Sequence, residues 1–160
     1  MSIHVWSYFL WGFLATLVLT GGMYAAQEAG LSRMSIPFLL GTAWTTDRRK
    51  AEAIGLATHF LNGLLFAVFY VMGFELLGQA TWWLGALGGA AHAFVVLTAG
   101  MHLLTAVHPN MADDRQGPTP TRWLEPPGLL GLNYGRRTPL VALVMHVVYG
   151  AILGAFYQVG

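Results

Sequence analysis

The charged residues of this chain lie in a few short clusters, and the charge-free stretches between them have the length of membrane-spanning helices. No Asp, Glu, Lys or Arg occurs before Glu28, between Glu52 and Glu75, between Glu75 and Asp113, or after Arg137. A helix that crosses a bilayer needs about 20 predominantly apolar residues. The pattern therefore predicts helices that cross a membrane rather than helices buried in a water-soluble domain.

The composition excludes several classes of protein. Of the 160 residues, 56% are hydrophobic and only 9% are charged, whereas soluble domains carry about 25% charged residues. Too few charges are present to cover the surface of a soluble enzyme, a disordered segment or a nucleic-acid-binding domain. The chain has no cysteine, which excludes disulfides, thiol chemistry and cysteine metal sites.

We predict an all-α fold, a four-transmembrane-helix bundle that forms a single integral membrane domain over residues 1–160. The four spans are expected at about 5–26, 53–74, 82–107 and 139–158. The first residues lack the positive charge and the small-residue cleavage site of a secretory signal peptide, so we expect the first helix to remain in the mature protein.

The basic residues predict the orientation of the bundle. All eight fall in the loops near 27–52 and 108–138, and none falls in the loop near 75–81 or in either tail. Because loops rich in Lys and Arg stay in the cytoplasm, both of these loops are expected to be cytoplasmic. The N- and C-termini are then outside, and the predicted location is the bacterial cytoplasmic membrane.

Short segments of the first half match segments of the second half in the same order. The chain is therefore expected to contain an internal repeat, with halves at about 1–78 and 79–160. The pattern H-x-x-x-G-x-x-x-x-x-x-Y runs from His59 to Tyr70 and again from His146 to Tyr157, and VLTGGMY at 18–24 resembles VLTAGMH at 96–102. The corresponding helices run in the same direction. The sequence therefore predicts two parallel helix–loop–helix repeats related by an axis along the membrane normal.

Histidines inside the predicted spans are the candidate site residues, because polar side chains in a membrane usually face the protein interior. His59 and His146 are equivalent in the repeat and lie at similar depths. We expect them in a polar cluster near the repeat axis that also contains His102, Tyr24, Asn62 and Tyr149. His92 lies nearer the middle of the membrane and has only Leu14 as its counterpart.

Three interpretations of this cluster remain open. The simplest is hydrogen bonding between helices. A second is a haem or another tetrapyrrole with His59 and His146 as axial ligands, since a two-fold pair presents imidazoles at one depth. A third is a zinc or copper site formed by three histidines. In the loop after the third span, His108, Asp113 and Asp114 could bind a cation, but a solvated loop is the commoner explanation, because charges in a loop need no function.

No catalytic motif accompanies these residues. The predicted spans contain no Asp or Glu, and the chain lacks the H-E-x-x-H, G-x-S-x-G and P-loop patterns. We therefore expect a protein that is not an enzyme, an accessory or structural subunit of a larger membrane complex. Haem or metal binding and transport of a small molecule are the alternatives. Small residues such as Gly85, Gly89, Gly150 and Gly154 recur every four positions and would serve packing within the bundle or a homo-oligomer face.

The glycine- and threonine-rich first helix, together with the two H-x-x-x-G-x-x-x-x-x-x-Y helices, resembles small bacterial four-helix integral membrane proteins. The resemblance covers most of the chain and implies the same fold. Those families carry no known active site, so the resemblance implies no functional residue.

Overall fold

The computed structural model describes residues 3–113 and 117–160 of the chain. It is 72% helical, and the described residues form no strand. Four helical segments are long and apolar enough to cross a membrane: Val5–Glu28 (α1), Arg48–Leu77 (α3), Trp82–Val107, which contains α4, η1 and α5, and Thr138–Phe156 (α6). The prediction of an all-helical chain with four long apolar helices is confirmed.

Helix α3 is longer at both ends than the predicted span, and local chemistry accounts for its limits. The Asp47 carboxylate accepts a hydrogen bond of 3.0 Å from the Lys50 backbone N–H, so it satisfies a free N–H group of the first turn. At the other end Gly78 adopts φ 64° and ψ 19°, the left-handed conformation that commonly ends a helix. Glu75 consequently lies in the last turn of α3.

The third long segment is not a regular helix. It begins as α4 (Trp82–Val95), passes through the π-helical turn η1 (Val96–Gly100) and continues as α5 (Met101–Val107). A π-helical turn accommodates an extra residue and is frequent at functional sites. It rotates every residue after it around the helix axis.

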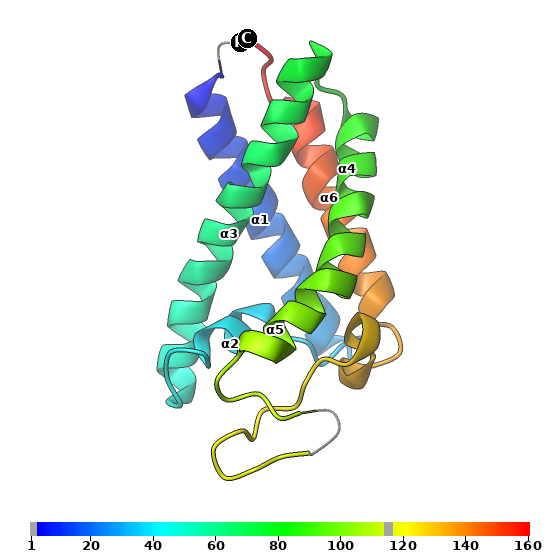
Figure 1. Ribbon diagram of the computed structural model, residues 1–160. Coiled ribbons are helices and arrows are strands. Elements are labelled where there is room, and N and C mark those ends of the chain that lie inside the picture. The colour runs from blue at the N-terminus through cyan, green and yellow to red at the C-terminus, as the bar shows by residue number, and fades with distance from the viewer. Residues whose placement is uncertain (1–2, 114–116) are drawn as a thin grey trace.

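Two short helices lie at the loop end of the bundle, which is opposite the chain termini (Figure 1). They are α2 (Ile36–Gly41), whose first turn is capped by Ser35, and the 3₁₀ segment η2 (Leu129–Tyr134). A buried hydrogen bond of 2.8 Å between the Ser32 and Thr138 hydroxyl groups connects the first loop to α6. The two long loops are therefore joined at one end of the molecule.

Glycines set which helices touch. A Cβ atom built on Gly85 would overlap the carbonyl oxygen of Gly150, and one built on Gly154 would overlap that of Thr81. This approach makes α4 and α6 the most closely packed pair of helices, and α1 packs against both α3 and α6. Helices α3 and α4 are not among the closely packed pairs of the described residues. The glycines of α4 and α6 thus serve packing within the bundle, which is one of the two roles that the sequence predicts for them; the other is a homo-oligomer face.

Candidate functional site

A cavity of about 360 Å³ lies in the half of the bundle nearer the loops. All four long helical segments contribute to its wall, and Ile36, Pro37, Leu39 and Leu40 of α2 close it at the loop end. The wall is mostly apolar, and none of its lining residues is Asp, Glu, Lys or Arg. Its volume falls at the lower end of the range of small-molecule sites, about 300–1,000 Å³.

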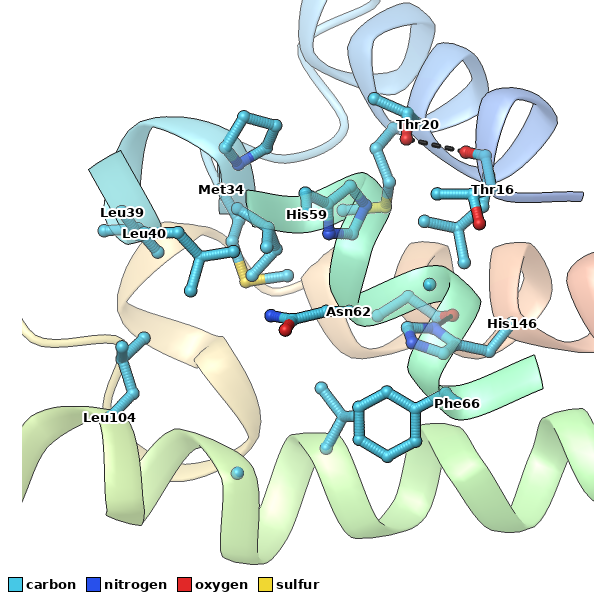
Figure 2. A pocket seen from close by; sticks show the side chains of 18 of the residues that line it. Thr16, Thr20, Met34, Leu39, Leu40, His59, Asn62, Phe66, Leu104 and His146 are labelled. Carbon is cyan, nitrogen blue, oxygen red and sulfur yellow. Dashed lines mark hydrogen bonds between the residues drawn. The ribbon is translucent and has the colours of Figure 1, made fainter. Parts of the chain in front are cut away.

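Three polar side chains point into this cavity from two helices. Figure 2 shows His59 and Asn62 of α3 and His146 of α6 directed toward the same space, with Phe66 one turn beyond Asn62. His59, Asn62 and Phe66 lie three, four or seven residues apart, so they share one face of α3. The structure thus brings His59 and His146, the two candidate axial ligands, to the wall of one cavity.

The two predicted tyrosines are placed differently. Tyr149 is buried, and its hydroxyl donates a hydrogen bond of 2.6 Å to the Gly63 carbonyl oxygen, which ties α6 to α3. Tyr24 also lines the cavity but is 40% exposed, so it lies at the rim. Tyr149 therefore has a structural partner already, whereas Tyr24 borders an opening.

His92 also lines the cavity, although its greater depth places it outside the predicted cluster. Its ring centroid is 4.2 Å from that of Phe66 and 4.8 Å from that of His146, and its Nδ1 atom is 3.2 Å from the Tyr70 hydroxyl. A signal was present in the sequence. His92 follows Gly89 by three residues, so it lies on the glycine face of α4 that packs against α6.

His102 does not reach this cavity. It is exposed, it borders a separate hollow, and its Nδ1 atom donates to the Thr98 carbonyl oxygen at 2.8 Å. In a regular helix, ten residues at about 100° each would place His102 some 80° from His92. The wide turn η1 takes up roughly one extra residue, which leaves the two side chains on nearly opposite faces.

The cavity opens beside α5. Leu103 and Val107 line it and are nevertheless 63% and 67% exposed, so they form one edge of a mouth. In a bilayer both side chains would face the lipid.

His108 holds the segment after α5 to α2, the helix that closes the loop end of the cavity. Its Nε2 atom lies 2.9 Å from the Leu39 carbonyl oxygen, and its Nδ1 atom accepts a 3.2 Å hydrogen bond from the Asn110 backbone N–H. Burial lowers the pKa of His108, and the nearby Arg122 lowers it further. The imidazole is therefore neutral and acts as a structural connection, not as a solvated cation ligand; Asp114 lies outside the described residues.

The described residues contain no group of three or more His, Cys, Asp or Glu side chains that could hold a metal ion. The three-histidine metal site is thus not assembled among them. Comparison with protein-family models, with curated proteins and with solved structures finds no match for the chain.

Proposed function

We propose that the chain is an integral membrane protein that takes up an apolar molecule from the bilayer in the cavity between α3 and α5. The observation that carries the proposal is the mouth of the cavity, whose lining residues Leu103 and Val107 are exposed on the apolar outer surface of the bundle. A molecule dissolved in the lipid could enter there without passing through water.

The distribution of charge supports the membrane orientation in this proposal. Arg33, Arg48, Arg49 and Lys50 precede or begin α3, and Arg122, Arg136 and Arg137 precede α6. These positions belong to the loop end of the bundle, opposite the termini (Figure 1). By the positive-inside rule this end is cytoplasmic, so the cavity lies in the cytoplasmic half of the membrane.

Cysteine labelling tests the orientation directly, because the chain has no cysteine of its own. Ile3→Cys and Gly160→Cys should react with a membrane-impermeant maleimide from outside intact spheroplasts, and Arg49→Cys should react only after lysis. Labelling of both terminal positions only after lysis would overturn the proposed orientation.

Photolabelling tests ligand entry. Met34 and Leu39 line the cavity but are only 2% and 3% exposed, so a probe that stays on the outer surface does not reach them. A long-chain hydrocarbon bearing a diazirine, incorporated in nanodiscs, should label both residues, as mapped by peptide mass spectrometry. Labelling confined to outward-facing residues such as Leu61 would contradict the proposal.

A matched pair of variants makes this test specific. Leu104→Trp adds bulk at a lining position of α5 and should abolish labelling of Met34 and Leu39. Leu87→Trp adds the same bulk at an exposed position of α4 that lines neither this cavity nor the hollow between α3 and α4, and it should leave the labelling unchanged.

Transport is a second candidate function, favoured by a second hollow. It has a volume of about 480 Å³, lies between α3 and α4 toward the terminal end, and shares Phe66 and His92 with the cavity. The two spaces thus follow one another along the same side of α3, separated by the contact of these two rings. A transporter would move its substrate past that contact, and Phe66→Trp should then slow movement of a lipid-soluble substrate across liposome membranes.

Two further hypotheses stay predictions with direct tests. An accessory subunit should co-purify with stable partners in mild detergent, or associate with itself. Haem binding by His59 and His146 would give a Soret band in protein from haem-replete cells, and both His59→Ala and His146→Ala would abolish that band.

A further inference from the structure

Four polar side chains that line the cavity have no hydrogen-bonding partner within the part of the chain that the structure describes: Tyr24, Gln27, His59 and Asn62. Of these, the His59 imidazole and the Asn62 carboxamide point into the cavity (Figure 2). In a membrane, a polar group without a partner costs free energy because no bulk water is available to bind it. Both groups are therefore available to a partner from outside the chain.

The hydrogen-bonding role of His146 follows from its backbone contact. Its Nδ1 atom lies 2.7 Å from the Ala142 carbonyl oxygen, and a carbonyl oxygen can only accept a hydrogen bond. In the neutral ring the proton is therefore on Nδ1, and Nε2 is left as an acceptor. Asn62 adds both an N–H donor and a carbonyl acceptor to the same cavity.

The charge of the wall limits the ligand further. The lining residues include no Asp, Glu, Lys or Arg, so a phosphate, carboxylate or ammonium group would be buried there without an opposite charge. A ligand that matches this wall has an apolar body and a small uncharged head that both donates and accepts hydrogen bonds.

We infer that the ligand is an uncharged lipid whose head bears a free hydroxyl group, such as a long-chain alcohol. The hydroxyl donates to His146 Nε2 and accepts from the Asn62 amide. The hydrocarbon tail of the lipid lies among Leu19, Met23, Leu104 and Phe66. This inference rests on the proposed uptake of an apolar molecule and adds the chemistry of its head group.

Three probes with the same dodecyl tail test the head group: dodecanol, dodecyl methyl ether and dodecyl phosphate. Each is added at the same membrane mole fraction to the full-length protein in nanodiscs, and binding is followed by thermal unfolding. Dodecanol should bind at least about tenfold more tightly than the other two. The ether keeps the acceptor and loses the donor, whereas the phosphate brings the charge that the wall does not match.

Asn62→Leu removes one polar partner at similar volume. Because Asn62 makes no hydrogen bond within the described chain, this variant loses no internal bond and should fold. His146→Phe removes the acceptor. Both should abolish the preference for dodecanol over its ether. His102→Phe is the control, because His102 makes the same hydrogen bond to the carbonyl oxygen four residues earlier but lies outside the cavity.

The outcomes separate the two levels of the proposal. Equal binding of dodecanol and its ether by the parent chain and by Asn62→Leu would overturn the hydroxyl assignment and leave uptake of an apolar molecule intact. Absence of binding by all three probes, together with no diazirine labelling of Met34 and Leu39, would overturn both.

Discussion

Helix α4 has one tightly packed side and one open side, and the difference lies in what faces it. Toward α6, glycines stand opposite glycines, and the backbones of Gly85 and Gly150 are in direct contact. Toward α3, Gly88 stands opposite the ring of Tyr70, and a Cβ atom on Gly73 of α3 would meet nothing within 4 Å. The glycines of α4 therefore bring it close to a partner that presents backbone, and not to one that presents a large ring.

The predicted repeat implies that contacts between helices should occur in equivalent pairs. If the halves are equivalent, α1 corresponds to the segment that starts with α4, and α3 corresponds to α6. The contact between α1 and α6 should then be matched by one between α4 and α3, yet only the first is a closely packed pair. Both hollows lie along the side of the bundle where α3 and α4 are not closely packed.

The largest expected effect comes from forcing the closed side apart. Gly150→Val should destabilise the bundle by about 3 kcal/mol or more, because overpacking of a tight contact costs 1–3 kcal/mol and here backbone is displaced. Gly73→Val, on the open side, should change stability little, since the added atoms meet empty space. Reversible unfolding in mixed micelles measures both. Equal losses in the two variants would mean that the open side is packed in solution.

The sequence was sufficient to locate the four long helices but not to predict which helices pack against one another. Gaps between charges locate four helices because a bilayer-length apolar stretch has few alternatives, and the segment 82–107 was predicted with its observed limits. The glycine stripes were also visible. Which stripe meets which partner depends on the residue opposite, as Gly88 and Tyr70 illustrate, and this information is not local in sequence.

The candidate site was predicted in part for the same reason. Distance from the charged boundaries groups His59 with His146, and both line one cavity in the structure. Depth says nothing about rotation around the helix axis, and the π-helical turn η1 changes that rotation between His92 and His102. A regular helical register does not reveal this rotation. The predicted cluster therefore lacks His92, which lines the cavity, and contains His102, which faces away from it.

The next largest effect concerns the closure of the open side at the loop end. His108→Ala should cost about 2 kcal/mol, because the Leu39 carbonyl and Asn110 N–H groups lose a buried partner. It should also increase the reactivity of a cysteine placed at Leu39, measured by maleimide labelling. A stability loss without greater reactivity would show that His108 does not close the cavity.

The same histidine predicts a dependence on pH. Its pKa in the folded chain lies below the ordinary value of 6.5, so the unfolded chain binds more protons and stability rises with pH. The contribution is complete above about pH 6.5 and declines as the pH falls below it. His108→Gln keeps a donor and an acceptor but does not titrate. The difference between its unfolding profile and that of the parent chain should therefore grow on acidification; parallel profiles would contradict the assignment.

A smaller effect is expected from joining the two hollows of the open side. Phe66→Ala removes the ring that contacts His92 at 4.2 Å, and loss of such an aromatic pair costs about 1 kcal/mol. Ala142 lines the cavity and is 1% exposed. In an Ala142→Cys background, Phe66→Ala should speed labelling by a small thiol reagent added at the terminal end. An unchanged rate would mean that this contact is not the barrier between the two spaces.

The smallest expected effect comes from glycine replacements that test whether a partner subunit covers the open side in the half nearer the termini. Gly73 lines the hollow between α3 and α4, and Gly21 lies on the exposed face of α1; a Cβ atom on either would meet nothing within 4 Å. Replacing a helical glycine by alanine gains about 0.5 kcal/mol through lower backbone entropy in the unfolded state. Gly73→Ala and Gly21→Ala should therefore stabilise the purified chain equally in calorimetric unfolding. In native membranes, however, a partner subunit seated between α3 and α4 would meet the new methyl group at position 73 and not at 21. If the two variants then diverge, with Gly73→Ala alone losing stability, the outer half of the open side is a protein interface.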